Sequence, residues 1–86
     1  MNFIDVSLNS YIELQTLIRA LSGEFSRIEI EPTGKQGKLE FRLHLTNPVI
    51  EKVVKQVKRT DVYQKDFINV FQNMATTTKL VLEFYD

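Results

Sequence analysis

Near the start of the chain, apolar residues follow first the spacing of a strand and then the spacing of a helix. Within residues 3–8, apolar side chains occupy every second position, which is the period of a strand with one buried face. Asn9 or Ser10 then supplies a side-chain oxygen that can cap a helix. From Tyr11 the apolar positions recur every three or four residues until Gly23, a residue that suits the left-handed conformation in which many helices end. The pattern predicts a strand followed by a helix.

Two further alternating runs follow, separated by a short segment with a proline and two glycines, and they predict a β-hairpin. Charge indicates the register of this hairpin. Placing Glu29 opposite Lys38 also sets Arg27 opposite Glu40, whereas a shift of two residues opposes like charges. We therefore expect the loop at residues 32–35.

Helical spacing returns after Asn47-Pro48, a pair in which asparagine can cap a helix and proline fits its first turn. One apolar stripe lies within residues 50–57 and another within residues 63–74, and their directions differ by about 90° around a common helix axis. One straight helix cannot bury both stripes, so we expect two helices with a break at Thr60-Asp61. Alternation in residues 80–85 predicts a final strand.

The predicted order is strand, helix, two strands, helix pair and strand, in a single domain formed by all 86 residues. A split β-α-β unit repeated in this way is the ferredoxin-like plan, an α+β fold with four antiparallel strands in the order 4-1-3-2. Both helical layers then cover one face of the sheet and leave the other face open. The handedness of crossovers favours this topology, and another strand order built from the same elements stays open.

Composition narrows the chemistry of the protein. The chain has no cysteine, which excludes disulfides, thiolate nucleophiles and zinc-thiolate sites. Its first residues include an acid where a secretory signal carries basic residues, and no apolar run approaches the roughly 20 residues of a membrane span. We therefore expect a cytoplasmic protein that makes no contact with a membrane.

The sequence offers little for catalysis. His44 is the only histidine, and a lone histidine at the end of a strand is usually a titratable surface group. The carboxylates alternate with basic residues in a pattern that strand pairing explains, so they do not indicate a metal site. Gly34 and Gly37 have the wrong spacing for a phosphate-binding loop. We expect a protein that is not an enzyme and carries no cofactor or metal.

The open face of the predicted sheet is a candidate binding surface. The first and second strands begin where the third and fourth end, so aromatic side chains gather at one end of this face. Placing Phe3 opposite His44 also sets Asp5 opposite Arg42. An aromatic cluster beside an arginine is typical of the centre of a protein interface, and it can also stack on nucleic-acid bases.

These features predict a small protein-binding module that acts as a regulator, inhibitor or accessory subunit. It would dock through the open face or a strand edge, either on another protein or on a second copy of the same chain. Fraying of the strand ends is the alternative explanation for the exposed aromatic residues. The candidate contact residues are Phe3, Phe25, Arg42, His44, Val81 and Tyr85.

A second hypothesis rests on the basic middle of the chain, which contrasts with two acidic ends and a net charge of zero. On the predicted helix, Lys52, Lys55 and Arg59 lie within about 60° of one another, opposite the apolar stripe. Such a face can contact a phosphate backbone, but a solvated helix face is the simpler interpretation, and we favour it. The alternative function is nucleic-acid binding through Lys52, Lys55, Lys58 and Arg59, with Lys35 and Lys38 on the hairpin as further contacts.

Overall fold

The computed structural model describes residues 3–34, 39–45, 50–74 and 78–86. These residues form a small α+β fold with a five-stranded mixed sheet, two α-helices and one short 3-10 helix. The strands are β1 (Phe3–Leu8), β2 (Arg27–Pro32), β3 (Leu39–His44), β4 (Val53–Lys58) and β5 (Leu80–Tyr85), and the helices are α1 (Tyr11–Ser22), η1 (Arg59–Tyr63) and α2 (Phe67–Met74).

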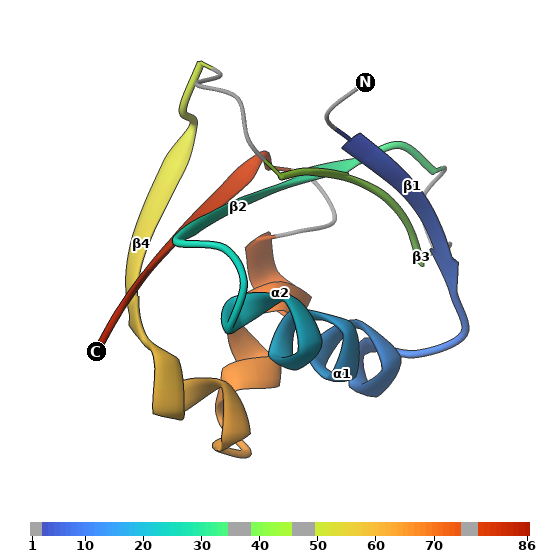
Figure 1. Cartoon of the computed structure of the whole chain (residues 1–86). Helices are drawn as coiled ribbons and strands as arrows, with labels where there is room; N and C mark the ends of the chain where they lie inside the picture. Colours follow the sequence, from blue (N-terminus) through green and yellow to red (C-terminus); the bar gives the residue numbers. More distant parts are fainter. Residues whose placement is uncertain (1–2, 35–38, 46–49, 75–77) are drawn as a thin grey trace.

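The sheet has the strand order β1-β3-β2-β5-β4 and curves over both α-helices (Figure 1). Both helices lie on its concave side, as the sequence predicts, and the described residues place no helix on the convex side. The hydrophobic core fills the space between the sheet and the helices. The fully buried side chains of this core include Leu14, Ile18, Ile28, Ile30, Leu43, Phe71, Leu80 and Leu82. No helix among the described residues is long and apolar enough to cross a bilayer.

The strand β1 and the helix α1 form where the sequence predicts them. The Ser10 hydroxyl caps α1 by accepting a hydrogen bond from the backbone N–H of Glu13. In return, the Glu13 carboxylate accepts a hydrogen bond of 2.8 Å from the backbone N–H of Asn9. Gly23 follows the helix with a φ of −77°, so the prediction of a left-handed cap was wrong. The backbone N–H groups of the next two residues bond to the Leu21 carbonyl instead.

Residues 53–58 form the strand β4, so the helix predicted between Asn47-Pro48 and Thr60-Asp61 was wrong for these residues. Three of these six residues are valines, whose β-branched side chains fit a pleated strand better than a helix. The strand pairs in parallel with β5, and Val57 lies opposite Phe84. The expected helix start at Asn47-Pro48 lies outside the described residues.

The expected break between two helices at Thr60-Asp61 was wrong, because a strand and not a helix precedes these residues. The 3-10 helix η1 occupies this position, and after a short turn α2 begins at Phe67. The aromatic side chains of Phe67 and Phe71 are buried, with their ring centroids 5.1 Å apart. The second apolar stripe of the sequence therefore does mark a helix, whereas Tyr63 at its start is 63% exposed.

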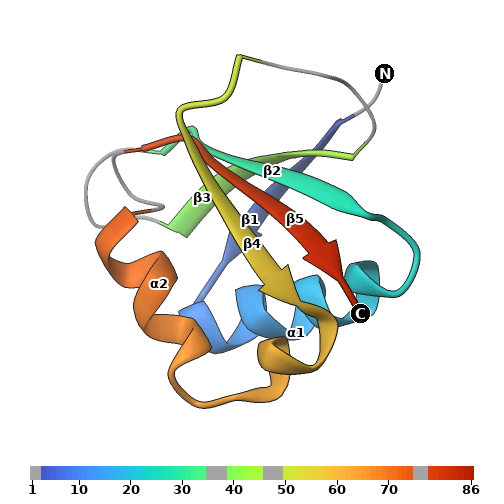
Figure 2. The same ribbon diagram turned by 90° about the vertical axis from the view of Figure 1, so that its left-hand side faces the viewer.

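The strand β5 lies beside β2 and not beside β1, so the ferredoxin-like order 4-1-3-2 does not hold. Leu80, Val81 and Leu82 are each 0% exposed, which means that β5 is buried on both faces. Such a strand needs a neighbour on each side, and β2 and β4 provide them (Figure 2). Because residues 53–58 form a strand and not the predicted helix, the sheet gains the extra strand β4, which covers the outer edge of β5.

The pairing of β1 with β3 has the predicted register. The two strands are antiparallel, with Phe3 opposite His44 and Asp5 opposite Arg42. The same register sets Ile4 opposite Leu43 on the concave side. This pairing brings the charged and aromatic residues of the first and third strands together.

The predicted hairpin of β2 and β3 exists, but its register was wrong. Glu29 lies opposite His44 and not Lys38, and Ile30 lies opposite Leu43 where the predicted register placed Gly37. A cross-strand charge pair contributes about 0.2–1 kcal/mol, whereas burial of one large aliphatic side chain contributes about 1.5–3 kcal/mol. Hydrophobic burial therefore outweighs the charge pairing from which the register was predicted.

The helix α1 also holds η1 in place through one buried polar side chain. Gln15, which is 6% exposed, donates from Nε2 to the Val62 carbonyl at 2.8 Å and to the Gln64 carbonyl at 3.1 Å. We expect Gln15→Leu to lower the free energy of unfolding by about 1–3 kcal/mol, because the Gln64 carbonyl loses the Gln15 donor and the Val62 carbonyl keeps only its 3.2 Å hydrogen bond from Arg19 Nε. Urea denaturation at neutral pH measures this change. The same substitution at the exposed Gln72 of α2 is the control, and equal effects at both positions would contradict the expectation.

Candidate protein-binding surface

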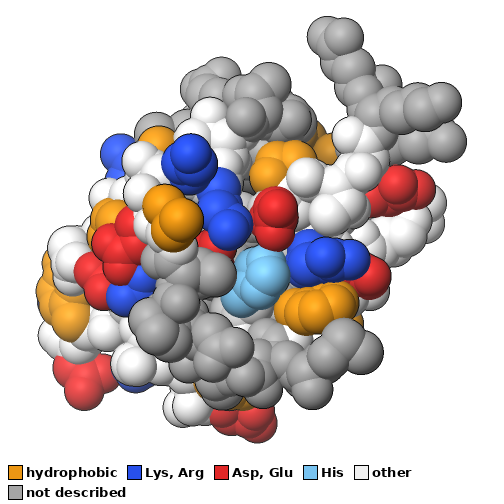
Figure 3. Space-filling view, turned by 90° about the horizontal axis from the view of Figure 1, so that it is seen from above, with side chains coloured by type: hydrophobic (Ala, Val, Ile, Leu, Met, Phe, Trp, Pro, Cys, Tyr) orange, Lys and Arg blue, Asp and Glu red, His pale blue; other side chains and the backbone are white. Residues whose placement is uncertain are grey.

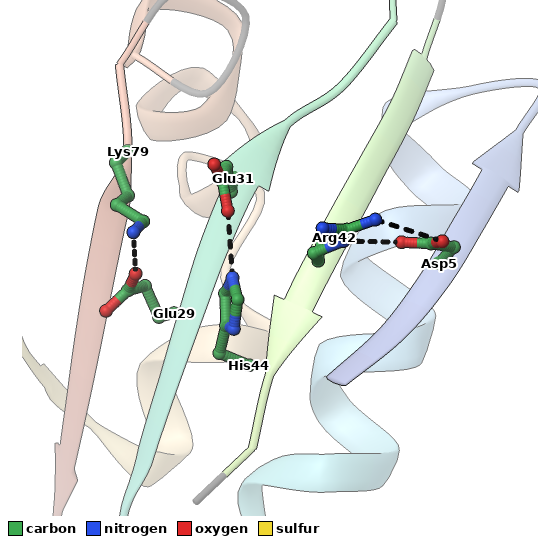
Figure 4. A network of polar contacts seen from close by, with 6 residues as sticks. All are labelled: Asp5, Glu29, Glu31, Arg42, His44 and Lys79. Carbon is green, nitrogen blue, oxygen red and sulfur yellow. Dashed lines mark hydrogen bonds and ion pairs between the residues drawn. The ribbon is translucent and has the colours of Figure 1, made fainter. Parts of the chain in front are cut away.

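The convex face of the sheet carries several ion pairs, and three of them link β1, β3, β2 and the residue before β5 (Figure 4). Arg27 of β2 also pairs with Glu83 of β5 on this face. Figure 3 looks onto this face and shows the histidine bordered by acidic and basic side chains. The pairs follow from the registers of β1, β3, β2 and β5, which bring alternate residues of these strands to the same side. We call the three pairs of Figure 4 the charge ladder: Asp5–Arg42, Glu31–His44 and Glu29–Lys79.

Phe3, Asp5, Arg42 and His44 form a compact group at the β1 end of the ladder, which we call the Phe3 cluster. Arg42 donates from Nε to one Asp5 oxygen at 2.9 Å and from Nη2 to the other at 3.4 Å. The same guanidinium lies 4.2 Å from the centroid of the Phe3 ring, which is within the range of a cation–π contact. The Phe3 and His44 rings are 5.9 Å apart. The contact of aromatic rings with an arginine that the sequence predicts is therefore formed here.

Arg42 is the main influence on the pKa of Asp5. The hydrogen bond from this guanidinium lowers the pKa of Asp5, and the positive charges of Arg42 and His44 act in the same direction against the opposing effect of burial. The pKa of Arg42 is raised by the same hydrogen bond. The pair therefore presents little net charge at the edge of the sheet.

His44 also contacts the second strand. Its Nε2 lies 2.8 Å from an Oε atom of Glu31. This hydrogen bond is the largest cause that lowers the pKa of Glu31, burial opposes it, and the charges of Lys79, His44 and Arg42 lower the pKa further. His44 thus connects the Phe3 cluster to β2.

Glu29 is the least exposed charged side chain of the convex face. It is 1% exposed, and Lys79 Nζ lies 2.7 Å from its Oε1 atom. Neither of its carboxylate oxygens has a hydrogen-bond donor in suitable geometry among the described residues, so Lys79 acts on Glu29 through its charge. Sequence reasoning missed the importance of this pair, although an acid inside the run Ile28-Glu29-Ile30 of a central strand would have indicated it.

Phe25, Val81 and Tyr85 do not join the Phe3 cluster. Phe25 lies outside β2 and packs against the core, and Val81 is fully buried opposite Glu29. Tyr85 is 50% exposed but lies opposite Lys58 of β4, on the far side of the sheet from β1. The predicted gathering of aromatic residues at one end of the face required β1 and the last strand to be neighbours, and they are not.

The basic residues of the alternative hypothesis do not form one face. Lys55 and Lys58 lie on β4, where the alternation of a strand directs them to opposite sides of the sheet, and Lys52 precedes the strand. Arg59 is engaged elsewhere, since its Nε donates to Asp86 at 3.0 Å and its Nη1 to the Phe25 carbonyl. Lys35 and Lys38 lie outside the described residues. The geometry therefore gives no support to a basic helix face.

The two edges of the sheet differ in character. The edge strand β1 carries no lysine and no proline, and its Ile4 is 47% exposed at the rim of the core. The opposite edge strand β4 carries Lys55 and Lys58, both exposed. Lysines on an edge strand discourage pairing with another chain, so β1 is the unprotected edge.

A groove of about 460 Å³ lies between β4 and the segment of η1 and α2. Its floor is apolar and includes Val57, Phe67 and Leu82, and its rim carries the opposite charges of Lys55 and Asp61. This groove was not foreseen because residues 53–58 were expected to be helical. Its mixed rim favours no single class of ligand.

The charge ladder brings carboxylate, imidazole and ammonium groups together in pairs. The described residues contain no group of three or more histidine, aspartate or glutamate side chains arranged to hold a metal ion. The Glu31–His44 pair places a carboxylate against an imidazole, but both groups are already part of the ladder. The exposed apolar and aromatic atoms near Phe3 and Ile4 are the part of this surface that a partner can cover.

Comparison with known proteins adds no relative. No protein-family model, curated protein or solved structure matches the chain. The functional argument therefore rests on the residues themselves.

We expect the protein to lose more stability when one partner of the buried Glu29–Lys79 pair is removed than when both are removed. Lys79→Met should lower the free energy of unfolding by about 3 kcal/mol, because it leaves the Glu29 carboxylate buried without a counterion. The double variant Glu29→Leu/Lys79→Met should recover most of this loss. Urea denaturation of both variants and the wild type tests the expectation, and a double variant less stable than Lys79→Met would contradict it.

The lowered pKa of Glu31 predicts a pH dependence of stability. Its pair with His44 contributes fully above the ordinary glutamate value of 4.5, and the contribution is lost as the pH falls through the lowered pKa of the folded state. Glu31→Gln should therefore be less stable than the wild type at pH 6, by up to about 1 kcal/mol for a partly exposed pair, and the difference should shrink on acidification below pH 4.5. Denaturation curves of the wild type and of Glu31→Gln across this range measure the difference, and a difference that does not shrink below pH 4.5 would contradict the expectation.

Proposed function

We propose that the protein is a small non-enzymatic binding module that docks a partner protein on the edge strand β1, with the Phe3 cluster as the adjoining contact. The observation that carries the proposal is the position of β1 at the edge of the sheet, where β3 is the one strand that pairs with it among the residues that the structure describes. The outer backbone groups of such a strand form a template to which a partner strand can hydrogen-bond. Action as a regulator, inhibitor or accessory subunit and a cytoplasmic location belong to the same proposal, and they rest on the sequence alone.

The centre of the convex face is a poorer docking site than its β1 edge. Its charged groups are already paired within the molecule, and a partner that covered them would remove water from ion pairs without supplying new counterions. At the edge, by contrast, the exposed side chain of Ile4 and the ring of Phe3 lie beside unpaired backbone. Apolar burial and backbone hydrogen bonds can both be gained there.

Arg42 makes this edge suitable for a protein partner. It neutralises Asp5, the only charged residue of β1, and its guanidinium also covers the Phe3 ring. Arginine and aromatic residues are enriched in the energetically important centres of protein interfaces. A partner strand therefore meets an edge that is apolar on the concave side and carries a neutralised pair on the convex side.

We expect Ile4→Lys to abolish capture of the partner while the fold is kept. The lysine adds a desolvation cost at the interface, as lysines on natural edge strands do, and Ile4 lies too near the surface to support the core. The measurement is affinity capture of tagged wild-type and variant protein from the cytoplasm of the native host, with the captured species compared one by one.

The matched control is Val54→Lys, which places the same charge at a 39% exposed valine on the opposite edge strand β4. Circular dichroism and thermal unfolding of both variants establish that they are folded. A partner captured equally by the wild type, Ile4→Lys and Val54→Lys would show that β1 is not the docking edge.

A further inference from the structure

The residue pattern of β1 allows a second copy of the chain to pair with it. Two identical edge strands related by a two-fold axis run antiparallel, and their side chains then share the same faces of one continuous sheet. Because residues opposite each other must point to the same face, an odd residue can only meet an odd residue and an even residue only an even one. This restricts the registers in which β1 can pair with itself.

Only two of these registers keep five of the six residues of β1 paired. In one, Asp5 lies on the two-fold axis and meets Asp5 of the second copy, which opposes like charges. In the other, Val6 lies on the axis, Ile4 meets Leu8 of the second copy, and Asp5 meets Ser7 of the second copy. The second register opposes no like charges and pairs all the apolar residues of the concave side with one another.

We infer that the partner of the β1 edge is a second copy of this chain, bound antiparallel in the register that places Val6 on the two-fold axis. The inference rests on the proposed function of β1 as the docking edge. In this dimer the two sheets become one, and the Leu8 side chain of the second copy covers the exposed Ile4. Val6 and Leu8 already pack against the core of their own chain, so pairing extends each core across the boundary.

The opposite edge strand, β4, is less suited to pairing with its own copy than β1 is. Self-pairing of β4 brings Lys55 and Lys58 of both copies to one seam, together with the nearby Lys52. Repulsion among these charges opposes association. At β1 the single charge of Asp5 is paired with Arg42, which lowers the electrostatic cost of bringing two copies together.

Sedimentation equilibrium over micromolar to millimolar concentrations tests whether the protein dimerises through β1. The wild type should show a monomer–dimer equilibrium, and Ile4→Lys should raise the dissociation constant by at least about tenfold, whereas Val54→Lys should leave it unchanged. Raising the salt concentration should not abolish the dimer, since its contacts are apolar and backbone contacts.

Single-cysteine variants report the register, because the natural chain has no cysteine. A residue on the two-fold axis lies about 4.5–5.5 Å from itself in the second copy, which is within reach of a disulfide, whereas its neighbours in the strand are farther from their own copies. Mild oxidation should therefore cross-link Val6→Cys and leave Asp5→Cys and Ser7→Cys as monomers on a denaturing gel.

The possible outcomes separate this inference from the proposed function. A wild type that stays monomeric at all concentrations, yet captures another protein through a contact that Ile4→Lys destroys, overturns self-pairing and keeps β1 as the docking edge. A dimer that Ile4→Lys does not weaken overturns the inference, as does preferential cross-linking of Asp5→Cys or Ser7→Cys. A dimer that cross-links through Val6→Cys and is weakened by Ile4→Lys supports it.

Discussion

The burial of β2 on both faces is the constraint on which the rest of the sheet depends. Ile28 and Ile30 on its concave side and Glu29 on its convex side are all within 1% of complete burial. The isoleucines fix the register by packing between the side chains of β3 and β5, and Glu29 requires a cation at the same level of the sheet. Lys79 supplies it, so one central strand determines how both of its neighbours are aligned.

The same constraint explains why the convex face is polar and why its ladder charges pair with one another. The position of β2 fixes Glu29 and Glu31. Glu29 then pairs with Lys79, Glu31 pairs with His44, and Arg42 pairs with Asp5. The charged groups of the charge ladder are therefore paired within the molecule. Another chain can bind more readily at the edges of the sheet. Among the described residues, the outer edge of β1 has no pairing strand, whereas the lysines of β4 discourage pairing at the opposite edge.

Local patterns succeeded where each segment had only one way to bury its apolar side chains. The alternation of residues 3–8 and the cap at Ser10 predicted β1 and α1, and the pairing of Phe3 with His44 followed from the position of the first and third strands. The segment Val53–Lys58 was ambiguous, because its apolar spacing suits a helix as well as a strand. Its β-branched valines and the unbroken run Leu80-Val81-Leu82, which needs a neighbour on each side, were the signals that favoured a strand.

The sequence by itself determined the class of the fold and the position of six of its elements, because each depends on residues close in the chain or on a simple alternation. The pairing of Asp5 with Arg42 followed from the expected adjacency of the first and third strands. Tertiary structure alone decided which strand lies beside β2, the hairpin register and the burial of Glu29 against Lys79. These features depend on contacts between distant segments that compete for the same neighbour. Cross-strand charges of similar strength fit more than one arrangement, and the arrangement that buries the most apolar surface prevails.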